Sequence, residues 1–185
     1  MNRRKFILAS TVGVSSSGAW LISNSSNAKG GKQLMAEEVN QKLQKLEQEP
    51  ETVVEFTLSN EEWASVLSEE AYYVLRKEGT ERPFTSEFND EKREGDYACA
   101  ACGLVLFRSD KKYESGTGWP SFFDIVEGRI DTKLDFKLVL PRTEYHCARC
   151  GGHQGHVFKD GPAPTGLRYC NNGVALTFIP ASSDS

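Results

Sequence analysis

The sequence predicts a mainly β domain, an antiparallel sheet or small barrel-like sandwich, preceded by short N-terminal helices. From about Tyr97 onward, apolar residues alternate with polar ones, as they do in strands with one buried face. Glycine and proline recur between these segments and restrict each strand to a few residues. Before Tyr97, apolar residues instead recur every three or four positions, which is the spacing of amphipathic helices.

Residues 1–28 have the features of a removable export signal. Arg3, Arg4 and Lys5 precede an apolar stretch, and Ser26-Asn27-Ala28 supplies the small residues that a signal peptidase requires. The arginine pair resembles a twin-arginine signal. We therefore expect export to the periplasm or an equivalent lumen, and a cytoplasmic location if the leader is not functional. Serine and glycine dilute the apolar stretch, so we expect no stable membrane insertion. The alternative interpretation is an uncleaved N-terminal tail.

The charge of the remaining chain argues against nucleic acid as a partner. The whole chain has 22 basic and 26 acidic residues, and the predicted signal contributes three of the basic ones and none of the acidic ones. Its removal leaves 19 against 26, a formal charge of −7. The phosphate backbone of a nucleic acid would be repelled by this negative charge.

Three helical segments are expected before the strands. Residues 29–56 are interpreted as a linker with a helix that ends by Pro50, because apolar residues recur at helical spacing at Met35, Val39, Leu43 and Leu46. A second helix should follow Ser59, which can form a capping box with Glu62. A third is expected from Glu69 to Glu78, where Gly79 ends it.

Residues 57–181 are expected to form one domain, in which short strands follow the helices. Leu104–Phe107 follows a turn, and residues 174–179 alternate apolar with polar side chains. Residues 133–140 show the same alternation, which predicts one strand with a single apolar face made of Leu134, Phe136, Leu138 and Leu140.

Two matched cysteine pairs predict a metal site. Cys99 and Cys102 form one Cys-x-x-Cys-Gly knuckle, and Cys147 and Cys150 form another. Four thiolates can hold one zinc ion tetrahedrally and leave no position for substrate, so we expect one structural zinc per chain. The competing interpretation is a pair of redox disulfides, which an oxidising compartment would favour.

Cys170 is the one cysteine outside both knuckles. A lone cysteine is often an inert buried residue. Three features favour a reactive thiol instead. Arg168 would share its strand face, as would Asn172 on the other side. His153 and His156 lie shortly upstream and could activate the sulfur.

Four motifs in one register resemble the zinc-containing branch of the B-type peptide methionine sulfoxide reductases. The motifs are the paired knuckles and the segments Ser115–Phe122, His153–Pro162 and Pro164–Cys170. The resemblance covers roughly residues 57–180 and implies two antiparallel sheets with short flanking helices. It also implies a peptide-methionine (R)-S-oxide reductase that acts on free or protein-bound sulfoxide.

Carried over position by position, the resemblance makes Cys170 the nucleophile, surrounded by His153, His156, Arg168 and Asn172. The substrate pocket would include Trp119, Phe122 and Val157. Trp119 would receive the S-methyl group, although from the residues alone it could equally be a core residue. Oxidised proteins would be the substrates, and the chain would act as a monomer.

Thr117 departs from the family pattern, because many relatives carry a resolving cysteine at this position. With four cysteines assigned to metal, we expect a thioredoxin-like protein or a small thiol to reduce oxidised Cys170 directly. Gln154, where leucine is usual, is a second departure. Two other functions stay open on the sequence: a non-catalytic zinc-ribbon-like interaction module, and a thiol–disulfide oxidoreductase that uses the paired cysteines.

Overall fold

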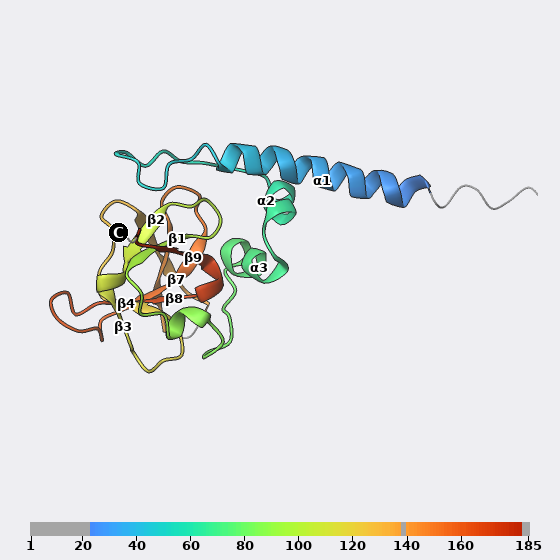
Figure 1. Cartoon of the computed structure of the whole chain (residues 1–185). Helices are drawn as coiled ribbons and strands as arrows, with labels where there is room; N and C mark the ends of the chain where they lie inside the picture. Colours follow the sequence, from blue (N-terminus) through green and yellow to red (C-terminus); the bar gives the residue numbers. More distant parts are fainter. Residues whose placement is uncertain (1–22, 138–139, 183–185) are drawn as a thin grey trace, which may run out of the picture.

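The computed structural model describes residues 23–137 and 140–182, and two antiparallel sheets form the body of the domain that follows the helices (Figure 1). A three-stranded sheet has the order β2-β1-β9, formed by Val105–Arg108, Gly95–Cys99 and Leu176–Pro180. A six-stranded sheet has the order β3-β4-β8-β7-β6-β5, formed by Lys112–Tyr113, Ser121–Phe122, Arg168–Asn171, His153–Phe158, Arg142–Cys147 and Ile130–Asp135. The predicted mainly β architecture with two antiparallel sheets is confirmed.

Aromatic residues from both sheets form the core. Phe107 stacks on Phe122 with ring centroids 4.1 Å apart, and both side chains are fully buried. Tyr97 meets the same Phe122 ring edge-on at 5.0 Å. Such large buried rings supply much of the hydrophobic stabilisation of a domain of this size. The sheets are thereby held in a fixed relation, which positions the polar face of the larger sheet.

Within the described residues, three helices precede the sheets. A short 3-10 turn, Glu87–Asn89, lies between the last helix and β1, and two others, Ser109–Lys111 and Gly173–Ala175, connect strands. α1 spans Ser23–Leu43 and contacts α2 (Asn60–Val66), which lies below it in Figure 1. An ion pair between Lys42 and Glu62 joins the two helices. The capping box predicted at Ser59 is present. α3 spans Glu69–Lys77, in close agreement with the predicted segment, and Glu78 adopts the left-handed conformation at its end.

The helix predicted in the linker ends earlier than expected, at Leu43 and not at Pro50. Residues 1–22 of the predicted export signal lie outside the described residues, and Ser26–Ala28 lies within α1. Among the described residues, no helix combines the length and the apolar character that crossing a bilayer requires.

The strand predicted over residues 133–140 is wrong for Phe136, Lys137 and Leu140, which lie outside any strand, and residues 138–139 are outside the described part of the chain. β5 ends at Asp135, and β6 begins only at Arg142. Leu134, Phe136 and Leu140 are 64%, 69% and 77% exposed. Their alternation therefore does not indicate a buried face; it marks apolar side chains at the solvent-exposed end of the β5–β6 hairpin.

The segment that joins α1 to α2 is bound to the sheet region. The Arg149 guanidinium donates to the Glu47 carbonyl at 2.6 Å, and Arg129 donates to the carbonyls of Gln48 and Pro50. The Val105 backbone N–H also donates to Gln48. These bonds fix the predicted linker beside the second cysteine knuckle, which contains Arg149.

Candidate active site and metal centre

One face of the six-stranded sheet carries a row of polar side chains that crosses all its strands. Successive register pairs join Tyr113, Ser121, Cys170, His156, Glu144 and Lys133. Cys170 stands in the middle of the row, between Ser121 on β4 and His156 on β7. Directly opposed residues of an antiparallel pair have Cβ atoms about 4.5–5.5 Å apart, so the thiol and the imidazole are immediate neighbours.

A β-bulge places both predicted histidines on this face. β6 and β7 pair Tyr145 with Gly155 and His146 with His153, which leaves Gln154 as an extra residue. In a regular strand, His153 and His156 would point to opposite faces, because residues three apart do so. Glycine is required beside the bulge, because a Cβ on Gly155 would lie 1.9 Å from the Cys170 carbonyl oxygen.

The thiol of Cys170 is partly buried, and its surroundings shift its pKa in opposite directions. Burial raises the pKa of Cys170, whereas the charge of Arg168 and hydrogen bonds from Thr117 and Arg168 lower it, and the net shift is upward. Thr117 in turn bonds to Ser115 at 2.8 Å, and Ser115 bonds to Ser121 at 2.7 Å. In the free protein the sulfur is therefore held mainly as a thiol that needs a base to ionise.

A pocket of about 120 Å³ opens over this thiol. Its lining consists of Thr80, Trp119, Arg142, Gly155, His156, Phe158, Cys170, Asn171 and Asn172. This is space for a small group. It combines two aromatic walls with a sulfur nucleophile, an imidazole and an amide. A small group with an apolar part and a polar atom fits this combination.

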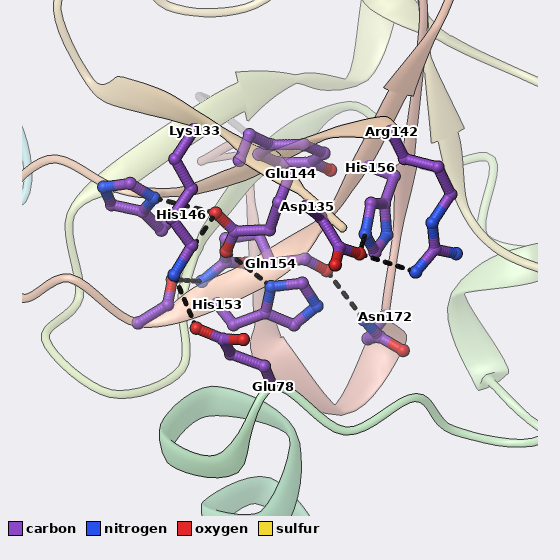
Figure 2. A network of polar contacts seen from close by, with 12 residues as sticks. Glu78, Lys133, Asp135, Arg142, Glu144, His146, His153, Gln154, His156 and Asn172 are labelled. Atoms are coloured by element: carbon purple, nitrogen blue, oxygen red, sulfur yellow. Dashed lines mark hydrogen bonds and ion pairs between the residues drawn. The ribbon is translucent and has the colours of Figure 1, made fainter. Parts of the chain in front are cut away.

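Each histidine is held by a carboxylate (Figure 2). His153 Nδ1 lies 2.6 Å from Glu144 Oε1, and His156 Nε2 lies 2.8 Å from Asp135 Oδ2. Burial opposes ionisation of Glu144, but hydrogen bonds from His146 and His153 lower its pKa to about 2. These pairs orient the imidazole rings, as carboxylates commonly do for functional histidines.

Asp135 is also held in its ionised form. Its pKa is lowered below the usual range by the backbone N–H of Lys137 and by hydrogen bonds from His156 and Arg142. An ionised carboxylate only accepts hydrogen bonds, so the ring nitrogen of each histidine that faces it must be the donor. The other nitrogen of a neutral ring is then an acceptor.

The protonation state suits His156 to the role of a base. Burial lowers its pKa more than Asp135 raises it. The ring is therefore neutral at neutral pH, and the nitrogen that does not face Asp135 is an acceptor on the register partner of Cys170. His153 is only 2% exposed, and its Nε2 has no hydrogen-bond partner among the described residues. Figure 2 shows this nitrogen turned away from Glu144, toward the side where Asn172 lies.

The buried residue Glu81 connects the two sides of the pocket. Its carbonyl accepts from Trp119 Nε1 at 3.2 Å, and its N–H donates to Asn172 Oδ1 at 3.0 Å. Its carboxylate accepts from the backbone N–H groups of Gly173 and Val174 at 2.6 and 3.0 Å. Glu81 thus fixes the aromatic wall and the amide relative to Cys170, although it does not line the pocket itself.

Glu81→Ala keeps the backbone bonds to Trp119 and Asn172 but removes the carboxylate that anchors this backbone to Gly173 and Val174. The variant is expected to lower kcat/KM for the pocket's substrate about 100-fold, because displacements near 1 Å can cost that much. The reactivity of Cys170 toward hydrogen peroxide should stay within twofold of wild type, since the thiol keeps its own neighbours. Glu87→Ala, at an exposed position of the adjacent 3-10 turn, is the matched control. Equal losses in both variants, or none in Glu81→Ala, would contradict this positioning role.

The four knuckle cysteines converge on one point. Their Sγ atoms lie within 4.8 Å of one another, and all four side chains are buried. Cys99 Sγ is 3.7 Å from Cys150 Sγ, and Cys102 Sγ is 3.6 Å from Cys147 Sγ. Four sulfurs 2.3 Å from a central zinc are about 3.8 Å apart, so the observed separations fit a tetrahedral metal site. They are too long for disulfide bonds.

Two polar side chains support the sulfurs from outside. Gln154 Nε2 donates to Cys99 Sγ at 3.4 Å, and an Arg76 guanidinium nitrogen donates to Cys150 Sγ at 3.5 Å. The backbone carbonyl of Gln154 accepts from Asn172 Nδ2 at 2.9 Å. The bulge residue therefore contacts both the metal cluster and the amide beside Cys170.

The other predicted site residues lie partly outside the pocket. Phe122, which is predicted to contact substrate, lies in the core against Phe107. Val157 lines an adjoining groove and not the pocket. Asn172 follows β8 as the cap of a 3-10 turn, so it does not continue the strand face of Cys170 as expected, although it does line the pocket. Arg168 pairs with Asp160 at 2.8 Å while contributing its charge to Cys170.

Comparison with known proteins identifies a family. The model of the SelR domain matches residues 67–180. A peptide methionine sulfoxide reductase MsrB of Methanosarcina barkeri is 56% identical over 121 residues, which cover 65% of this chain and 85% of that protein. The MsrB of Leptospira interrogans is 52% identical over 125 residues, 67% of this chain and 95% of the relative.

Proposed function

The chain belongs to the SelR family of MsrB peptide methionine sulfoxide reductases, and we propose that it reduces the R epimer of methionine sulfoxide through attack by Cys170. The observation that carries the mechanism is the position of this thiol. It lies in a small, partly aromatic pocket beside a neutral imidazole that can accept its proton.

The reaction balances without any other oxidant. As His156 takes the thiol proton, the Cys170 sulfur attacks the sulfoxide sulfur, and the proton is delivered to the sulfoxide oxygen. The oxygen, now carrying the proton, forms a bond to the Cys170 sulfur as its bond to the substrate sulfur breaks. The bond between the two sulfurs breaks as methionine leaves, and Cys170 is left as a sulfenic acid. The substrate sulfur gains two electrons, and the cysteine sulfur loses two.

The pocket's asymmetry is the basis for the proposed epimer selection. An apolar methyl group fits against Trp119, which lines one side. The sulfoxide oxygen needs the hydrogen-bonding side, where His156 and Asn172 lie. The S epimer would place its oxygen against the indole ring or its methyl group against the polar residues. Leaving buried polar groups unpaired in this way lowers transition-state binding strongly.

An external thiol is the proposed reductant. Thr117 contacts the Cys170 sulfur at the position where many relatives carry a resolving cysteine, and a hydroxyl cannot form a disulfide. The other four cysteines are clustered at the metal site. Two thiol groups of a thioredoxin-like protein, or two small thiol molecules, would convert the sulfenic acid to thiol and water while forming one disulfide.

Zinc is the proposed metal at the cysteine cluster, because four buried thiolates in a tetrahedral arrangement suit its softness and geometry. The bound ion would contribute folding stability, with no open position for substrate.

Oxidised proteins are the proposed substrates, and export is proposed for the N-terminal segment. N-terminal sequencing of the protein recovered from the extracytoplasmic fraction would test the latter.

The proposal is tested by incubating racemic methionine sulfoxide with the protein and excess dithiothreitol. The expected result is conversion that stops at half of the material, with only the S epimer left by chiral chromatography. Conversion of the S form would contradict the proposed selectivity, and no conversion would contradict the proposed activity. Replacing dithiothreitol by thioredoxin or by glutathione identifies the class of reductant.

A further inference from the structure

An open groove adjoins the pocket at the ends of strands β6 and β7. It has a volume of about 660 Å³ and is lined by Leu140, Pro141, Arg142, Thr143, Val157, Phe158 and Lys159. Leu140 is 77% exposed, although removing an aliphatic side chain of this size from water is favourable. Arg142 is paired with Asp135 at 2.7 Å, so its charge there is already compensated.

The groove is continuous with the pocket over Cys170. Arg142 and Phe158 line both, so the two spaces meet along these side chains. On the sheet face opposite to Cys170, the groove surface continues from Val157 toward the outer strand, because Val157 opposes Thr143, which is the register partner of Leu134 on β5. Leu134 is 64% exposed. A residue next to the one in the pocket could reach the groove, since consecutive Cα atoms are about 3.8 Å apart.

We propose that this groove is a second subsite, which binds an apolar side chain adjacent in sequence to the methionine sulfoxide of a polypeptide substrate. The inference rests on the proposed function and adds a sequence preference to it. Leu140, Pro141, Val157 and Phe158 provide an apolar surface, and no acidic residue lines the groove. Burying one aliphatic side chain in an apolar site changes binding by about tenfold or more.

The test measures binding separately from turnover. In the Cys170→Ser background, titration calorimetry gives the Kd of blocked peptides that carry methionine sulfoxide beside either leucine or serine, on the N-terminal or the C-terminal side. For at least one side, the leucine peptide should bind about tenfold more tightly than the serine peptide. Adding Leu140→Ser should reduce that ratio to within twofold of one. Leu34→Ser, at a 62% exposed position on α1, is the matched control and should keep the preference.

Equal Kd values for leucine and serine peptides on both sides would overturn the subsite. A preference that survives Leu140→Ser unchanged would also overturn it. The proposed activity is checked separately, with free methionine sulfoxide and the enzyme that retains Cys170. Leu140→Ser should leave kcat/KM for this substrate unchanged, because it has no neighbouring side chain to bind.

Discussion

Cys170→Ser is expected to lower the rate of methionine sulfoxide reduction by roughly 10⁴-fold or more, the scale of loss when a catalytic nucleophile is removed. A serine hydroxyl in this pocket can neither ionise readily nor accept the sulfoxide oxygen to form a sulfenic acid. The measurement is methionine formed per minute in the presence of dithiothreitol. The metal content should stay the same, because Cys170 lies outside the knuckle cluster.

The same replacement separates the proposed enzyme from a non-catalytic metal module. If the chain acted only as an interaction scaffold, Cys170→Ser would leave every measurable function unchanged. Retention of more than a tenth of the wild-type rate would contradict the assignment of Cys170 as nucleophile. Loss of metal together with activity would instead indicate that the variant had misfolded.

Removing one ligand of the metal cluster is expected to have the largest effect on stability. Cys102→Ser should lower the thermal midpoint by more than 15 °C or prevent folding, because structural zinc can contribute about 10 kcal/mol, as much as the whole stability of a typical domain. The ion would hold the β1–β2 turn to the end of β6, two segments that are distant in the chain. Circular dichroism on heating and zinc analysis provide the readouts.

The control for this experiment is Cys170→Ser, which removes a cysteine outside the cluster and should keep both zinc and midpoint. A Cys102→Ser protein with an unchanged midpoint would contradict the structural role of the metal. If the paired cysteines instead formed redox disulfides, purified protein would contain no zinc, and reduction by a thiol would titrate them.

Spacing along the chain was sufficient to predict the features that depend only on residues close together in the sequence. The two knuckles, the isolated Cys170 and the capping box at Ser59 were all visible as patterns of three to five residues. The approach of His153 and His156 to Cys170 could be expected only in outline. It depends on a bulge at Gln154, which alters the strand alternation by one residue.

The partners of these residues could not be predicted, because they come from other strands. Glu144 and Asp135 reach the histidines through the register of β5, β6 and β7, and Glu81 reaches the pocket from the loop after α3. The alternation within each strand does not identify which residues of separate strands oppose one another. For Glu81 the local signal was absent, since a glutamate beside threonine and arginine ordinarily indicates a solvated loop.

The apolar alternation of residues 133–140 led to a different error, a predicted feature that the structure does not have. It predicted a buried strand face where the chain exposes Leu134, Phe136 and Leu140. Alternation reports a difference between two faces but does not say which of them is covered. Here the hairpin extends past the edge of the core, so nothing in the described residues buries its end.

Trapping the oxidised sulfur tests the central claim most directly. Wild-type protein is mixed with excess methionine sulfoxide and dimedone in the absence of any reductant, and the modified peptide is located by mass spectrometry. The account predicts one methionine formed per chain and a single dimedone adduct, on Cys170. Absence of the methionine burst, or an adduct confined to Cys99, Cys102, Cys147 or Cys150, would contradict it.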